Sequence, residues 1–214
     1  MVKRVYIDTS VVGGRFDKEF SADTISFFNA VEASLFVIII SDLLEAELLR
    51  APQHVQEFLK GISKKHIEIV RLTKEAAELA NHYISAKVVG PTSRADCQHI
   101  AMATIAKADI LVSWNFKHIV NLEKIRGYNG INYQLVHNMI EIRTPKKLSV
   151  MTTQNSDISS NVVEDLRRIR DEISREIKDM TFEEERAYLD HLLSSSQPPA
   201  PNPALAIAGS DVQE

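Results

Sequence analysis

Short apolar runs alternate along this chain with segments whose apolar residues recur every three or four positions. Four runs rich in valine and isoleucine predict buried strands, at 4–8, 35–41, 66–72 and 110–114. Periodic segments predict helices, at 21–33, 42–49, 54–62, 74–86 and 93–107. Because strands and helices alternate, the expected fold class is α/β, with a mostly parallel central sheet flanked by helices.

The pattern changes near residue 148. Before that point, 121–138 predicts a helix with a loop and 140–143 a short edge strand, which completes a first domain at 1–148. Polar residues without periodicity predict a linker at 149–160. Beyond it we expect a C-terminal helical extension at 161–194, followed by a disordered tail at 195–214 that is rich in serine, proline and alanine.

The helical extension carries two start signals and one apolar face. Asn161 with Glu164, and Thr181 with Glu184, have the spacing of capping boxes. On the first helix the apolar residues form one stripe: Val162, Leu166, Ile169, Ile173 and Ile177. A charged helix with such a stripe needs a partner surface to cover it.

Composition and charge limit where the protein works. Cys97 is the single cysteine, which excludes an intramolecular disulfide framework and favours the reducing cytoplasm. The start lacks the pattern of a signal peptide, and the longest apolar run, 35–40, is too short to span a membrane. The net charge of -4 divides unevenly, with -7 on residues 151–214 and +3 on residues 1–150. A mildly basic front domain tolerates a phosphate-bearing partner, and an acidic tail can compete with that partner for the same surface.

Polar residues follow two of the predicted strands. The first strand ends in Asp8-Thr9-Ser10, and the strand near 110 ends in Ser113-Trp114-Asn115. In an open parallel sheet, ligands bind at the carboxyl ends of the strands, so both groups are expected on one edge. Taken alone, Asp8 is more readily explained as a helix cap than as a functional residue.

Two further acids strengthen the functional interpretation. Asp96 lies in the first turn of an otherwise apolar helix, where a carboxylate is costly unless it is paired or bound to a cation. Glu45 and Glu47 follow the second strand, and their spacing lets only one of them face the edge. Three carboxylates that converge need a cation, and oxygen ligands of this kind suit Mg²⁺ or Mn²⁺. Such a metal supports hydrolysis of a phosphodiester.

Other chemistries lack their motifs. The sequence has neither a GxxxxGK[ST] loop nor a GxGxxG motif after the first strand, and Asp8-Thr9-Ser10 is not an Asp-x-Asp motif. Cys97 and His99 have no second ligand pair at zinc spacing, so a buried thiol and a core histidine are expected. Gly13-Gly14 predicts only a turn.

The four groups together resemble a known family. The segments are Ile7-Asp8-Thr9-Ser10, Ser41 with Glu47-Leu48 six residues on, Arg94 to Ala101 (RADCQHIA) and Leu111 to Ile119 (LVSWNFKHI). Their order and spacing resemble the PIN domain, and specifically the VapC-like toxin ribonucleases, over residues 1–146. The resemblance implies a PIN-like fold and a metal-dependent endoribonuclease, usually a homodimer, that is restrained by a cognate antitoxin.

The same resemblance assigns roles to residues. It selects Glu47 over Glu45, so that the metal ligands are Asp8, Glu47 and Asp96. Asn115 replaces the fourth acid of the family, and we expect it to complete the catalytic set by positioning water or substrate. Its lack of charge weakens any second metal position. The groups expected beside the ligands or the substrate are Thr9, Ser10, Ser113 and His118, although a surface histidine is the simpler explanation for His118.

Residues 164–186 resemble the short helical antitoxins that accompany such toxins. If this segment packs on the first domain, an arginine can occupy the carboxylate site much as a metal would. The candidates are Arg167, Arg168, Arg170 and Arg175. An equally weighted alternative is a solvated helix with ordinary pairs such as Asp171 with Arg175.

These observations lead to one main hypothesis and two others. We expect a cytoplasmic, Mg²⁺- or Mn²⁺-dependent ribonuclease that is not bound to a membrane, acts on RNA and is restrained by its antitoxin-like segment in cis or by a separate antitoxin. One alternative is a catalytically weakened PIN-fold module that binds RNA or protein. The other is a structure-specific or DNA-directed nuclease.

Overall fold

The structure is a computed structural model that describes residues 2–148 and 162–195. Its centre is a five-stranded sheet in the order β3-β2-β1-β4-β5, and every neighbouring pair is parallel. The strands are β1 (Lys3–Ile7), β2 (Phe36–Ser41), β3 (Ile67–Val70), β4 (Ile110–Val112) and β5 (Glu141–Arg143). The predicted α/β class is confirmed.

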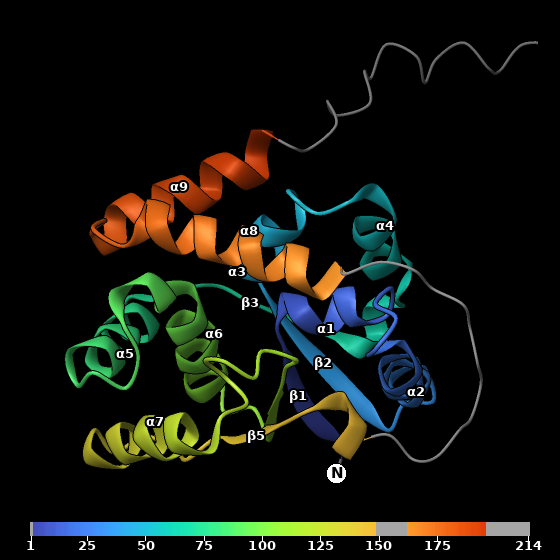
Figure 1. Cartoon of the computed structure of the whole chain (residues 1–214), viewed down its shortest axis with the longest axis horizontal. Helices are drawn as coiled ribbons and strands as arrows, with labels where there is room; N and C mark the ends of the chain where they lie inside the picture. Colours follow the sequence, from blue (N-terminus) through green and yellow to red (C-terminus); the bar gives the residue numbers. More distant parts are fainter. Residues whose placement is uncertain (1, 149–161, 196–214) are drawn as a thin grey trace, which may run out of the picture.

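Helices cover both faces of this sheet (Figure 1). On one side lie α5 (Lys74–Ser85), α6 (Arg94–Ile105) and α7 (Leu122–Gln134), and on the other lie α1 (Thr9–Gly14), α2 (Ser21–Glu32) and α4 (Gln53–Gly61). The short α3 (Asp42–Leu48) continues directly from β2, and three 3₁₀ turns lie at Lys64–His66, Pro91–Ser93 and Pro145–Lys147. Strand order reverses between β1 and β4, which is where sheets of this kind bind ligands.

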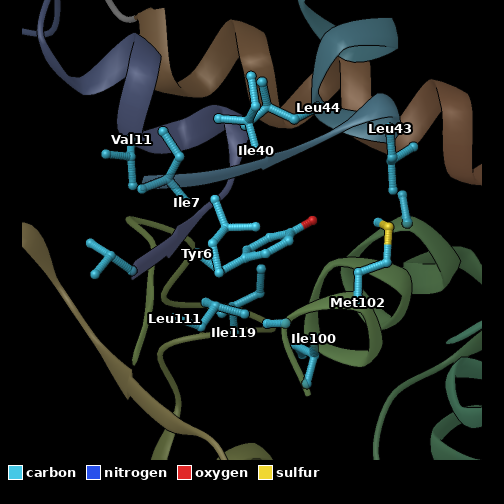
Figure 2. Packing of buried hydrophobic residues seen from close by; sticks show 14 of the residues in the cluster. Tyr6, Ile7, Val11, Ile40, Leu43, Leu44, Ile100, Met102, Leu111 and Ile119 are labelled. Carbon is cyan, nitrogen blue, oxygen red and sulfur yellow. The ribbon is translucent and has the colours of Figure 1, made fainter. Parts of the chain in front are cut away.

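The core confirms most of the predicted apolar pattern. Figure 2 shows the ring of Tyr6 packed among residues from the sheet and from the helices on it: Ile7, Val11, Ile40, Leu43, Leu44, Ile100, Met102, Leu111 and Ile119. Continuous apolar runs in β1, β2 and β4 are buried because helices cover both of their faces.

Two local predictions need correction. β3 is a short edge strand rather than a buried one: among the described residues it pairs only with β2, and 62% of Ile69 is exposed. Gly13 and Gly14 do not form a turn but belong to helix α1. At Gly13 the reason is close packing, because an added Cβ would overlap the side chain of Leu166.

The C-terminal extension forms two helices, α8 (Val162–Ile177) and α9 (Phe182–Ser195). Helix α8 contacts α1, α3 and α6, and α9 contacts α3, so the pair lies across the carboxyl ends of the strands (Figure 1). All five residues of the predicted stripe are buried against this surface. The extension therefore packs on residues 2–148 of its own chain.

Of the two capping boxes predicted for the extension, the structure describes only the second in full. Glu184 accepts hydrogen bonds from the backbone N–H and hydroxyl of Thr181, and its own N–H donates to that hydroxyl, which confirms the second capping box. Asn161 of the first box lies outside the described residues, as do the predicted linker at 149–160 and all but the first residue of the predicted tail. Ser195, placed in that tail, is the last residue of α9.

Candidate active site

Asp8 lies at the end of β1, at the N-cap position of α1, and is fully buried. Its side chain makes no capping hydrogen bond, so the helix-cap interpretation does not account for the carboxylate. Instead, Oδ1 accepts a hydrogen bond from Ser10 Oγ at 2.5 Å, and Oδ2 accepts one from Ser113 Oγ at 2.7 Å. The two hydroxyls fix the carboxylate in one orientation at the switch point of the sheet.

Glu47 comes from the second strand-helix junction. Ser41 ends β2 and caps α3 by accepting a hydrogen bond from the Leu44 N–H, which orients the helix that carries Glu47. Glu47 is fully buried and accepts a hydrogen bond from the Thr9 hydroxyl. Burial opposes its ionisation, but the charges of Arg170 and His99 and their hydrogen bonds outweigh this effect and lower the pKa of Glu47. Glu45 is half-buried on another face of the helix.

Asp96 supplies the third carboxylate, from the first turn of α6. Its Oδ1 accepts a hydrogen bond from the Asn115 amide at 2.9 Å, whereas its buried Oδ2 has no hydrogen-bond partner among the described residues. Burial raises the pKa of Asp96 to about 6 even though Arg170 acts against it. One oxygen of this site therefore has no donor from the part of the chain that the structure describes.

The guanidinium of Arg170 lies among all three carboxylates. Its Nη1 is 3.0 Å from Asp8 Oδ2 and 3.3 Å from Asp96 Oδ1, and its Nε is 3.0 Å from Glu47 Oε1. Nη2 donates to the second oxygen of Glu47 at 3.3 Å. Arg170 is only 2% exposed, so the charges meet away from solvent, where their attraction is strong. The structure thus brings the three predicted acids together around a cation.

The other three candidate arginines do not reach this cluster. Arg167 donates to the backbone carbonyl of Trp114 at 2.6 Å, and the exposed Arg168 pairs with Asp165 on its own helix. Arg175 donates to the backbone carbonyl of Asp171 rather than to its carboxylate. Sequence spacing alone did not distinguish these four residues.

Asn115 and His118 lie at the edge of the cluster. Asn115 directs its amide nitrogen at Asp96, and its Oδ1 accepts hydrogen bonds from the backbone N–H groups of Lys117 and His118, each at 3.1 Å. His118 is half-buried, and its Nδ1 has no hydrogen-bond partner among the described residues. Both residues, with the exposed Phe116, line a cavity of about 570 Å³ beside α8. Asn115 links this cavity to the cluster, because it both lines the cavity and contacts Asp96.

Sequence reasoning missed two residues behind Glu47. His99 is a buried core histidine, as expected, yet its Nε2 lies 3.3 Å from Glu47 Oε1. Its Nδ1 is 2.9 Å from the hydroxyl of Tyr6, which donates to Ser41 Oγ at 2.8 Å. The available signals were the spacing of His99, one turn after Asp96, and of Tyr6, two residues before Asp8. Cys97 is a buried thiol, and burial raises its pKa.

A second set of contacts, also missed, joins the extension to the first domain. Glu185 of α9 is buried and pairs with Arg94, the first residue of α6, and it accepts a hydrogen bond from Gln98 at 2.8 Å. Arg50, just after α3, donates from Nη1 and Nη2 to the two carboxylate oxygens of Glu176 at 3.0 and 2.8 Å. Arg186 pairs with the buried Asp42.

Comparisons with known proteins add no assignment to this geometry. No family model, curated protein or solved structure matches the chain. Within residues 2–148 and 162–195, no helix is long and apolar enough to cross a membrane. In the same residues, no three His, Cys, Asp or Glu side chains stand in an arrangement ready for a metal ion.

Proposed function

We propose that this chain is a metal-dependent endoribonuclease of the toxin type, related to the PIN domain, and that helices α8 and α9 hold it inactive. One observation carries the proposal: Arg170 of the antitoxin-like segment lies among Asp8, Glu47 and Asp96. Three buried carboxylates at a sheet switch point are a costly arrangement unless a cation is part of their function.

The donor set fits Mg²⁺ or Mn²⁺. All the converging groups are carboxylate oxygens, which these hard cations prefer, and Asp96 Oδ2 is a buried oxygen without a donor in the described part of the chain. Asp8, Glu47 and Asp96 would hold the metal. When bound, such a metal supplies water activation and neutralises charge at the phosphodiester.

The remaining residues of the site act by positioning. The hydroxyls of Ser10 and Ser113 fix Asp8, and the Thr9 hydroxyl with His99 fixes Glu47. Asn115 fixes Asp96 and places the loop that carries His118 beside the cavity. Because these contacts already hold the acids in place, little reorganisation is needed at the moment of reaction.

In this proposal Arg170 inhibits by occupying the position of the metal. A guanidinium neutralises the carboxylates and fills their centre, but it neither activates water nor leaves room for a phosphate. The helix must move before RNA is cut. We place this activity in the cytoplasm, where RNA is present and a lone cysteine stays reduced.

Cleavage by the full chain tests the proposal. Arg170→Met keeps most of the side chain's volume, and in Mg²⁺ it is expected to raise cleavage of single-stranded RNA about 10- to 100-fold over the wild type. Arg168→Met, an exposed arginine on the same helix, is the matched control and should change nothing. Adding Asp96→Asn to Arg170→Met should abolish the gained activity. Duplex RNA and single-stranded DNA are the substrates that reveal a structure-specific or DNA-directed nuclease.

The second candidate function is an RNA- or protein-binding module with a PIN-like fold. It is favoured by Asn115, whose carbonyl oxygen is engaged by two backbone N–H groups and whose amide adds no negative charge to the site. An Arg170→Met protein that retains RNA in Mg²⁺ without cutting it would select this candidate and reject the nuclease.

A further inference from the structure

Two arginines of the first domain are close in sequence to carboxylates of the cluster, and both are paired with acids of the extension. Arg94 begins α6 two residues before Asp96, and Arg50 follows Glu47 by three residues at the end of α3. Arg94 is bound by Glu185, and Arg50 by Glu176. Glu47 and Asp96 therefore each have an arginine within three residues along the chain.

Arg94 is part of a prepared anion site. Its Nη1 donates to Asn81 Oδ1 of α5 at 2.9 Å, a contact within the first domain that holds the guanidinium in place. Gln98, one turn further along α6, directs its amide nitrogen at the same carboxylate. Arg94 and Glu185 are 9% and 1% exposed, so the anion is enclosed by donors. The two N–H donors that converge on this carboxylate group, Arg94 Nε and Gln98 Nε2, would also suit the oxygens of a phosphate.

Arg50 binds its acid in a two-pronged geometry. Nη1 and Nη2 each donate to one oxygen of Glu176, and Nη2 also donates to the Tyr188 hydroxyl at 2.7 Å. Parallel hydrogen bonds from a planar guanidinium are the geometry that arginine uses for both carboxylates and phosphates. The Arg50–Glu176 pair thus has the form of an arginine–phosphate contact.

We propose that Glu176 and Glu185 stand in for two phosphates of RNA, and that Arg50 and Arg94 are substrate-binding residues uncovered when α8 and α9 move away. The inference deepens the proposed function and rests on it. RNA carries a phosphate at every nucleotide, so a strand held at the carboxylate cluster presents anions on both sides of it.

Charge supports this assignment over a purely structural one. The extension and its flanks carry a net charge of -7, whereas residues 1–150 carry +3. An ion pair as buried as Arg94–Glu185 contributes little to stability after its desolvation cost, so stability alone does not explain it. A phosphate-binding role explains why the arginines lie next to the acids rather than elsewhere on the contact surface.

RNA binding by the full chain in EDTA tests the inference, with a fluorescein-labelled single-stranded RNA as the probe and anisotropy as the readout. Glu176→Gln with Glu185→Gln removes the negative charge of both proposed stand-ins while it keeps their shape and one accepting oxygen of each. This variant should bind the RNA about fivefold more tightly than the wild type. Adding Arg50→Ala and Arg94→Ala should cancel the gain and lower the log–log salt slope by about 0.7 for each arginine.

Arg4→Ala in the same Gln background is the matched control. Arg4 lies near the amino end of β1, at the opposite end of the sheet from the proposed site, and pairs with Glu68. Its loss removes one positive charge, as the loss of either Arg50 or Arg94 does, without touching that site. RNA affinity that stays at the wild-type level after Glu176→Gln and Glu185→Gln would overturn the inference. So would an equal loss of binding from Arg4→Ala.

A second pair of variants leaves the buried Arg94 unchanged, so that the test does not depend on whether a substitution at Arg94 folds. Arg50 and Glu176 are 29% and 43% exposed, so Glu176→Gln and Glu176→Gln with Arg50→Ala test the same idea at a tolerant position. Because EDTA prevents metal-dependent cleavage, these measurements are independent of the nuclease assay. Suppose that Arg170→Met cuts RNA but that adding Arg50→Ala and Arg94→Ala does not change RNA affinity. The nuclease function would then be supported, and the proposal that Glu176 and Glu185 replace phosphates would be rejected.

Discussion

The extension meets the first domain at two places with opposite charge. At the carboxylate cluster, α8 brings one cation, Arg170, to three acids. At Arg50 and Arg94, α8 and α9 bring acids to two cations. The extension therefore places a charge opposite to that of the first domain at each of the two places. It has a positive group where a metal is proposed and negative groups where phosphates are proposed.

The carboxylate cluster and the two arginines should also contribute to different properties of the protein. Removing Arg170 takes away the counter-charge that contacts all three buried carboxylates, whereas removing Glu176 leaves an arginine that is already partly in water. Stability should therefore be dominated by the cluster, and RNA affinity by the arginines. The following predictions separate these contributions.

Arg170→Met should have the largest effect on stability. In EDTA at pH 7 it is expected to lower the free energy of unfolding by about 3–5 kcal/mol, because it leaves buried charges uncompensated. Mg²⁺ at about a hundred times its dissociation constant should return about 2.7 kcal/mol to this variant, and much less to the wild type. Urea unfolding with and without Mg²⁺ measures both effects. An equal response of the two proteins to Mg²⁺ would contradict the view that Arg170 and the metal share one position.

Asp96→Asn should change the pH dependence of stability. The pKa of Asp96 is raised to about 6, so at intermediate pH the folded protein holds a proton that the unfolded chain has already released. The stability contributed by Asp96 therefore falls as pH rises from about 4 to about 6. Asparagine cannot titrate, so the variant should gain about 3 kcal/mol relative to the wild type between pH 4 and pH 7.

Urea unfolding of both proteins across this range is the measurement. Glu47, whose pKa is lowered, loses its stabilising effect as pH falls, but it is present in both proteins and is removed by taking the difference. A stability difference that stays constant with pH would mean that Asp96 is not held in a desolvated cluster.

Gly13→Ala tests the packing of α8 without touching a charge. The new methyl group would overlap Leu166, so the variant should lose about 1–3 kcal/mol and show more RNA cleavage in Mg²⁺. Gly130→Ala is the matched control, because a Cβ there meets nothing within 4 Å. If Gly13→Ala lowered stability without raising RNA cleavage, the packing of α8 on α1 would not be what keeps the site inactive.

Thr181→Ala should have the smallest effect. It removes the hydroxyl that caps α9 and should cost about 1 kcal/mol, mostly from α9 rather than from α8. Hydrogen exchange should therefore increase along α9 while the amides of α8 near Arg170 stay protected. Equal exposure of both helices would show that the two contact zones open as one unit.

Local patterns predicted much of the fold. Continuous apolar runs predicted β1, β2 and β4, and the stripe from Val162 to Ile177 predicted a face that needs a partner. The edge position of β3 was missed because a run of apolar residues does not say how many of its sides are covered. The helical state of Gly13 was missed because the reason for a glycine there is Leu166, more than a hundred residues away.

The resemblance of the motifs to a known family was needed to choose Glu47 over Glu45. The residues alone predicted Asp8 and Asp96 at strand–helix junctions and a helix that requires a partner. These features follow from local periodicity and from the rule that parallel strands end at one edge of a sheet. Long-range packing selects Arg170 rather than Arg167, Arg168 or Arg175 for the cluster, and it places Glu185 on Arg94. Helix spacing gives the face of each side chain, but the position of that face over a distant surface is set by how the whole helix docks.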